Sequence, residues 1–430
     1  MSLSHYVRRT YEIWKYAGWS SVKQKILARV FQQGYWGSYT PEALLYSTWM
    51  DFSEEDVIAS RRLHEIYAGP MDIRSITWFL PDFTHPYYGG VYTLLRFAEY
   101  FQRVKGIDNH FAILGNIKED EISRKIGEAF PALAGQPVRK FTLQSHVDGF
   151  ERTDAAIATL WGTAYFMLKF NETCRKFYFI QDYEPLFYPA GSVSAQVEAS
   201  YQFGYYGIAN TPTLKEIYEK EYGGKAEYFV PCVDTTVFHP PAQKPSESSR
   251  PVRIFVYGRP GHPRNGFELA AQALRLLKKK LGDQIEIVSA GDRWYPGHYS
   301  LDGVVENLGL LSIEETAELY RSCDIGFVMM FTRHPSYLPF ELMASGCLVV
   351  TNYNPATTWF LKDQENCLLS SASATTLMHT LEKAVLDKEN RERITRNALQ
   401  EIQSSYSDWD QQIEKIYAYM VDPEASRQPG

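Results

Sequence analysis

Short apolar runs alternate with helix-forming stretches along most of this chain, and no other feature constrains its fold as strongly. Helical stretches between short strands are typical of βαβ units and a parallel sheet. The sequence therefore predicts an α/β fold. The predicted strands are rich in β-branched and aromatic residues and lie at Ser75–Phe83, Phe111–Leu114, Arg139–Leu143, Phe177–Gln181, Tyr205–Ala209, Tyr228–Val230, Ile254–Tyr257, Ile285–Ser289, Val304–Leu308, Ile325–Met330 and Leu348–Thr351.

Helices are predicted between these strands, and two of them have recognisable starts. Thr153 and Asp154 are candidate N-caps for one, and Ser312 with Glu315 forms a capping box for another. The predicted helices are Gly89–Val104, Glu119–Phe130, Thr153–Phe170, Val193–Phe203, Leu214–Tyr222, Phe267–Leu281, Ile313–Ser322, Phe340–Ser345 and Trp409–Met420.

A segment rich in proline and serine, residues 240–251, interrupts the alternation and reads as a linker. A chain of 430 residues is also too long for one ordinary core. We therefore predict a helical N-terminal extension (1–70), two Rossmann-like doubly wound domains facing a cleft (71–240 and 251–405), and a C-terminal helix and tail (406–430).

Charge and composition narrow the class of protein. A net charge of −7 disfavours nucleic-acid binding, and no run of 18 apolar residues or signal peptide is visible. The five cysteines are widely spaced in apolar surroundings, which favours reduced, buried thiols over a metal site. Together these features predict a cytoplasmic protein.

The first 33 residues differ from the rest, because six Lys or Arg and several aromatic residues accompany the single acid Glu12. Such a segment can lie on an anionic membrane surface, here the inner face of the cell membrane. The alternative is a helical extension that packs on the main body or forms a homodimer contact.

The turn Tyr257–Phe267 (YGRPGHPRNGF) follows the first strand of the second domain and leads into a helix near Asn265. Arg259 and Arg264 offer permanent charge and planar donor groups suited to phosphate. The helix N-terminus adds partial positive charge. This pattern favours a diphosphate site, with a solvated surface turn as the alternative. The Gly-x-Gly-x-x-Gly motif of dinucleotide folds is absent.

A second motif, residues 324–352, reads as strand, loop, helix and strand, with Glu341 near the start of the helix. Loops after parallel strands are where α/β proteins bind ligands. An acid there can bind the hydroxyls of a sugar or nucleotide.

Three segments of the first domain also end strands. Gly89 and Gly90 open the helix after the first strand, so their N–H groups can face a ligand. Asp182 and Glu184 follow a later strand end, and His146 and Asp148 follow another. Taken singly, His146 and Asp148 are also consistent with ordinary loop residues.

These motifs resemble the donor and acceptor motifs of family 4 glycosyltransferases, which have the GT-B fold. The segment Val233-Asp234-Thr235 with Phe238 and Pro240 resembles the end of the first domain in that family. HPSYLPFE, GRPGHPRNGFEL and QDYEPLFYPAGS look most like bacterial rhamnosyltransferases that build rhamnan and surface-layer glycans. In the family, the last helix crosses back onto the first domain.

The resemblance implies a metal-independent, retaining glycosyltransferase without a cofactor, whose donor is dTDP-L-rhamnose or another nucleotide-diphosphate sugar. A growing glycan, carried on a lipid, would be the acceptor. The implied catalytic residues are Arg259, Gly90 and Asp182. The implied donor-binding residues are Arg259, Arg264, Asn265, Gly89, Gly90, His334, Tyr337, Leu338 and Glu341. The implied acceptor-binding residues are His146, Asp148, Asp182, Tyr183 and Glu184.

Two departures from the family pattern keep an alternative open. Family members often carry two glutamates eight positions apart, but here Arg333 stands eight positions before Glu341. The usual His-Glu-Pro is replaced by Tyr183-Glu184-Pro185. The alternative is a catalytically silent GT-B protein that binds glycan or nucleotide sugar.

Overall fold

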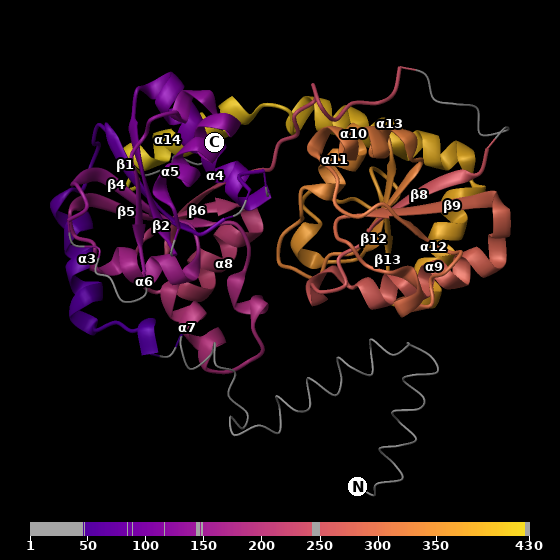
Figure 1. The fold of residues 1–430 in the computed structure, drawn as a ribbon, viewed down its shortest axis with the longest axis horizontal. Coiled ribbons are helices and arrows are strands. Elements are labelled where there is room, and N and C mark those ends of the chain that lie inside the picture. The colour runs from indigo at the N-terminus through magenta and orange to yellow at the C-terminus, as the bar shows by residue number, and fades with distance from the viewer. Residues whose placement is uncertain are drawn as a thin grey trace, which may run out of the picture. The chain divides into compact units, whose positions relative to one another are not determined.

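A computed structural model describes residues 46, 48–83, 85–87, 89–115, 117–142, 147, 149–242 and 250–425. Two compact units share these residues, and Figure 1 shows each with its own sheet. One unit holds the described residues up to Pro231 together with those from Asp408 onward, and the other holds residues 232–407. The basic segment 1–33 lies outside the described residues, so the structure does not test its proposed membrane contact.

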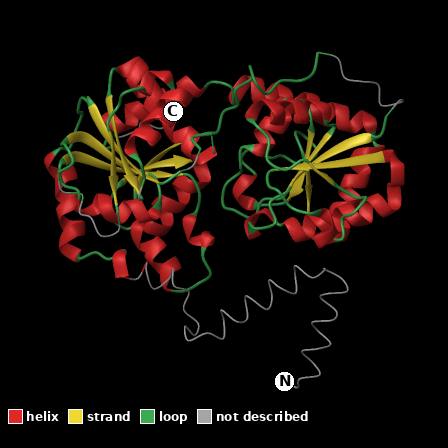
Figure 2. Ribbon diagram, in the orientation of Figure 1, coloured by secondary structure: helices red, strands yellow, loops and turns green. Residues whose placement is uncertain are grey.

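The first unit has a parallel sheet with strand order β3-β2-β1-β4-β5-β6-β7 in its described part, and helices cover both faces of this sheet (Figure 2). The chain order reverses between β1 and β4, which is the switch point where such sheets bind ligands. The strands are β1 Ser75–Pro81, β2 Asp108–Leu114, β3 Val138–Phe141, β4 Thr153–Ala158, β5 Thr173–Ile180, β6 Tyr206–Asn210 and β7 Lys225–Phe229. The helices are α3 Glu54–Ile66, α4 Gly89–Tyr100, α5 Glu119–Ala129, α6 Trp161–Lys169, α7 Ser192–Ser200, α8 Pro212–Tyr222 and α14 Trp409–Val421.

The predicted helix Thr153–Phe170 is wrong in its first half. Residues Thr153–Ala158 form β4, which pairs with β1 on one side and β5 on the other, and the helix begins only at Trp161. Ala155, Ala156 and Ala158 are fully buried there. Small side chains suit a central strand that is covered on both faces, and this packing outweighs the helix propensity of alanine. Asp154 is no helix cap, because its carboxylate accepts the N–H groups of Arg74 and Ser75 at 2.8 and 3.2 Å.

The second unit repeats this architecture with strand order β10-β9-β8-β11-β12-β13. Two helices, α9 Phe267–Leu281 and α10 Ile313–Ser322, have the predicted bounds, and the Ser312–Glu315 capping box is confirmed. The sequence did not predict β13, α12 or α13. The remaining elements are β8 Val252–Tyr257, β9 Ile285–Ala290, β10 Glu306–Asn307, β11 Ile325–Val328, β12 Leu348–Asn352, β13 Leu368–Ser370, α11 Leu338–Ala344, α12 Ala374–Leu386 and α13 Lys388–Ser405.

Helix α14 returns from the second unit to the first, as the fold class predicted. Its Ile413, Ile416 and Met420 are fully buried. The Lys415 ammonium pairs with the Glu227 carboxylate at 3.0 Å and donates to the Tyr228 carbonyl at 2.7 Å. These contacts attach the end of the chain to β7 of the first sheet.

Two further findings bear on the predicted class of protein. All five cysteines are buried and none forms a disulfide, as their apolar surroundings predicted. Within the described residues, no helix combines the length and the apolar character that a bilayer crossing requires.

Candidate functional site

The arginine-rich turn lies at the carboxyl end of β8, where the sequence predicted it. Tyr257 ends the strand, a short 3-10 turn spans Pro263–Asn265, and α9 begins at Phe267. The Arg259 guanidinium is held within the turn, with one Nη 3.4 Å from the Tyr257 hydroxyl and the other 2.6 Å from His262 Nε2. Its Nε is buried without a partner among the described residues. Arg259 is therefore positioned but keeps one donor unused.

The pKa of His262 is affected by the positive charges of this turn. Burial lowers the pKa of its imidazole below the usual value, and the charges of Arg259 and Arg264 lower it further. A neutral imidazole can accept the hydrogen bond from Arg259 through Nε2. Two arginines that face one neutral ring leave the turn with net positive charge, which suits an anionic ligand.

The second predicted motif lies beside this turn. The N–H of Phe331, which follows β11, donates to the Arg264 carbonyl at 3.0 Å. Gly266 has φ +53°, and a Cβ there would lie 2.4 Å from the Phe331 ring, so only glycine allows this approach. The structure therefore brings Arg264, Asn265 and the 331–337 loop together at the carboxyl ends of β8 and β11.

The loop before α11 carries the predicted donor residues His334 and Tyr337, and Leu338 starts the helix, two residues earlier than predicted. The Thr332 hydroxyl donates to the His334 carbonyl at 2.7 Å, and Asn354 Nδ2 donates to the Thr332 carbonyl at the same distance. These bonds give the loop a defined shape in a chain segment without regular structure.

Glu341 lies in the first turn of α11, and its side chain is partly buried. No hydrogen bond or ion pair to the carboxylate is found within the described part of the chain. Burial alone raises the pKa of Glu341 from 4.5 to about 7. The carboxylate is thus an unused acceptor, which agrees with its predicted role in binding hydroxyl groups.

This pKa predicts how Glu341 affects stability. Between pH 4.5 and 7 the unfolded chain loses the proton while the folded protein keeps it, so the residue costs stability as pH rises through this window. Glu341→Gln removes that cost. Without ligand, we expect its melting temperature to exceed that of the wild type by about 3 °C or more at pH 8 and by much less at pH 5. Calorimetry at both pH values checks this. The exposed Glu314→Gln is the control, and an equal effect at both pH values would contradict the prediction.

Sequence reasoning missed two polar groups beside Arg259. Ser289 Oγ and Trp294 Nε1 are both buried without a partner within the described residues. A Cβ on Gly258 would lie 2.2 Å from the first and 2.4 Å from the second, so this glycine leaves room for them. Gly258, directly after a buried strand, was the available signal in the sequence. The two polar groups approach this glycine from β9 and from the loop after β9, which the sequence does not display.

In the first unit, Gly89 and Gly90 form the first turn of α4, as predicted. A Cβ on Gly90 would lie 3.5 Å from the Gln181 carboxamide, which the sequence analysis did not single out. Asp182 follows Gln181 and is 8% exposed, and one of its carboxylate oxygens accepts the Tyr183 N–H at 2.8 Å. Gly90, Gln181 and Asp182 thus lie at the carboxyl edge of the first sheet.

Tyr183 and Glu184, which the sequence predicted as acceptor-binding residues, are both buried and hydrogen-bonded within the first unit. Glu184 is 3% exposed, and its carboxylate accepts the Trp161 N–H at 2.7 Å at the start of α6. Charge of this sign is favourable at a helix N-terminus. Tyr183 points into the aromatic core, where its hydroxyl lies 2.6 Å from that of Tyr222. Both contacts favour structural roles. His146 and Asp148 lie outside the described residues.

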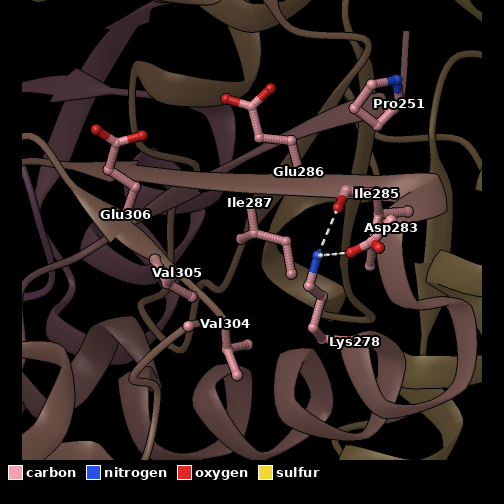
Figure 3. Close-up of a pocket in the computed structure, with 10 residues that line it drawn as sticks. Pro251, Lys278, Asp283, Ile285, Glu286, Ile287, Val304, Val305 and Glu306 are labelled. Atoms are coloured by element: carbon pink, nitrogen blue, oxygen red, sulfur yellow. Dashed lines mark hydrogen bonds and ion pairs between the residues drawn. The ribbon is translucent and has the colours of Figure 1, made fainter.

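Figure 3 shows a different hollow, along the β9 and β10 edge of the second sheet. There Lys278 Nζ donates to the Ile285 carbonyl at 2.9 Å and lies 3.9 Å from the Asp283 carboxylate. Ile285 is the first residue of β9, so this hollow opens at the amino ends of the strands. Ligands of parallel sheets bind at the opposite ends, and none of the predicted site residues lines this hollow.

The described residues contain no cluster of His, Cys, Asp and Glu that could hold a metal ion. The sequence prediction of a metal-independent reaction stays a prediction.

Comparison with known proteins agrees with the fold. Residues 252–382 match the family described as WsaF, C-terminal domain. The O-antigen biosynthesis protein RfbC of Myxococcus xanthus is 41% identical over 346 residues, which are 80% of this chain and 27% of that protein. The chain therefore spans about a quarter of the length of this relative.

Solved structures show the same fold at low sequence identity. HepE of Anabaena, in complex with UDP and glucose, superposes with a TM-score of 0.63 at 14% identity, over 80% of this chain and 99% of that one. Sucrose-phosphate synthase from Thermosynechococcus elongatus gives 0.60 at 14% identity, over 81% and 99%. The chain therefore has the GT-B fold, and most of its second unit matches the family of the WsaF C-terminal domain.

Proposed function

We propose that this protein transfers a sugar from a nucleotide-diphosphate donor to a growing glycan. The turn that carries Arg259 and Arg264 is the main support, because it combines two guanidinium groups with an unused buried donor at the carboxyl end of β8. The partnerless carboxylate of Glu341 would accept hydroxyls of the ribose or sugar. The similarity to an O-antigen biosynthesis protein supports a glycan product.

The proposed donor is dTDP-L-rhamnose, and the proposed reaction retains the anomeric configuration. As the bond to the sugar breaks, negative charge grows on the diphosphate, and Arg259 and Arg264 would stabilise that charge. The acceptor hydroxyl would attack from the same face and give its proton to a diphosphate oxygen. This route needs no nucleophile from the protein and no metal, since the arginines balance the charge of the leaving group.

Binding of dTDP, UDP and GDP compared by thermal shift tests the donor class, because a ligand raises the melting temperature with the logarithm of saturation. We expect a rise for all three in the absence of metal, and the largest for dTDP. Incubation with labelled dTDP-rhamnose and a rhamnan acceptor, with and without EDTA, then tests transfer. No shift with any diphosphate would contradict the proposal.

The same experiment decides the alternative of a silent GT-B protein. The absence of the usual glutamate at Arg333 favours that alternative. Nucleotide binding without transfer to any acceptor would establish it.

Three further parts complete the proposal: a lipid-linked acceptor, a homodimer and a peripheral membrane contact through residues 1–33. Light scattering tests the homodimer, and flotation with anionic vesicles tests the membrane contact.

A further inference from the structure

Two carboxamides, those of Gln181 and Asn210, lie at the ends of neighbouring strands at the carboxyl edge of the first sheet. Ile180 of β5 is in register with Ala209 of β6, so the next residues, Gln181 and Asn210, are neighbours as well. Neighbouring residues of parallel strands in register point to the same face. Asn210 is also in register with Phe229, whose ring contacts Phe97 of α4, so this face is the one that α4 covers (Figure 1).

Both carboxamides have an unused acceptor. Gln181 Oε1 and Asn210 Oδ1 are buried and accept no hydrogen bond within the described part of the chain. Asn210 is only 1% exposed. Buried polar atoms are nearly always paired, and one left without a partner costs stability. Two such oxygens on neighbouring strands form a pair of hydrogen-bond acceptors that a ligand with donor groups can bind.

The backbone beside this pair is strained. Thr211, directly after Asn210, has φ +140°, which is rare for any residue other than glycine, and it is fully buried. Its hydroxyl accepts the Leu214 N–H at 3.3 Å at the start of α8, which helps to hold the segment. Residues kept in such conformations cluster at ligand sites, where the surrounding structure enforces them.

On the side of α4, Gly90 lies against the Gln181 carboxamide without a side chain of its own. A Cβ at this position would lie 3.5 Å from both Oε1 and Nε2 of Gln181 and would cover the carboxamide. Gly90 has no positive φ, so the backbone does not require glycine there. The missing side chain therefore leaves space beside the carboxamide, and no special turn requires it.

We propose that Gln181 and Asn210 bind the hydroxyl groups of a sugar, in the reaction proposed above. A carboxamide oxygen accepts from a hydroxyl and its amino group donates to one, so two carboxamides match a neutral polyhydroxyl ligand. The unused oxygens would repel a phosphate. The sugar comes either from the acceptor glycan or from the donor.

Gln181→Met and Asn210→Leu keep the shape of each side chain and remove its polar atoms. We expect both variants to keep or raise the melting temperature, because an unpaired buried oxygen is lost. Asn109→Leu is the matched control. Asn109 is buried, accepts from Trp78 Nε1 at 2.8 Å and donates to the Ala98 carbonyl at 3.1 Å, so its loss lowers the melting temperature.

The kinetic constants identify the source of the sugar. A KM for acceptor raised tenfold or more, with the donor KM unchanged, assigns the pair to the acceptor. A raised KM for nucleotide sugar, with unchanged binding of the free nucleoside diphosphate, assigns it to the donor sugar. Gly90→Ala should raise the same constant. Unchanged constants in both variants, or melting temperatures that fall as in Asn109→Leu, would overturn the proposal.

If the wild type transfers no sugar, the proposed function fails but the pair can still be judged. Saturation-transfer NMR with the methyl glycosides of rhamnose, mannose, glucose and galactose then provides the readout. A signal in the wild type that Asn210→Leu abolishes supports the pair as a sugar site. The absence of any signal in the wild type overturns it.

Discussion

Arg259→Ala is expected to reduce the rate of sugar transfer by about 10²–10³, the usual cost of removing one preorganised donor from a site of developing charge. The guanidinium is held by Tyr257 and His262 and has an unused Nε, so it can bind an anion with little rearrangement. Arg259→Lys keeps the charge but loses the planar group of donors, and we expect an intermediate loss. Steady-state kinetics with a nucleotide-sugar donor provide the measurement.

The control for this effect is Arg275→Ala, on the exposed face of α9 in the same unit, where the guanidinium donates to Gln272 Oε1 at 2.6 Å. Its rate and melting temperature should match the wild type. Thermal shift adds a second readout: Arg259→Ala should lose most of the stabilisation by nucleoside diphosphate and keep that by the nucleoside. A variant with near-wild-type turnover and an unchanged diphosphate shift would refute the assigned role.

Local sequence signals predicted the elements whose bounds depend on neighbouring residues. Helix α10 begins where Ser312 and Glu315 close a capping box, and α9 ends at Leu281, before Gly282. The alanine-rich segment of β4 gave the opposite result, because its helix propensity is local while its burial between β1 and β5 depends on residues far away in the chain. Tertiary packing decided this element.

The site residues also divide into those with a local sequence signal and those whose position depends on distant parts of the chain. The turn with Arg259 was predictable because glycine and arginine follow a buried strand within a few residues. The burial of the Glu184 carboxylate was not predictable, because its partner is the N–H of Trp161 on a separate helix. The pairing of Gln181 with Asn210 likewise depends on the register of two strands, which a single sequence does not display.

The largest expected effect on stability comes from Arg175, at the centre of the first unit. It lies on β5, is 1% exposed, and donates to the carbonyls of Tyr67 and Gly69 on one side. On the other side it donates to the carbonyls of Met420 and Val421, at 2.9 and 2.6 Å. One guanidinium thus joins the chain after α3 to the end of α14.

Arg175→Met fills much of the space but removes the donors of the Tyr67, Gly69 and Met420 carbonyls, whereas the Val421 carbonyl keeps the Met71 N–H. Each buried group left unpaired costs about 1–3 kcal/mol. A total of roughly 3–5 kcal/mol would lower the melting temperature of a unit of this size by about 6–20 °C. Hydrogen exchange should rise throughout α14, because the helix loses its attachment at the C-terminal end. Lys225→Ala removes an exposed ion pair with Glu424 near the same end and should cost at most about 1 kcal/mol. Equal effects of the two substitutions, or unchanged exchange in α14, would show that Arg175 does not hold the returning helix on the first unit.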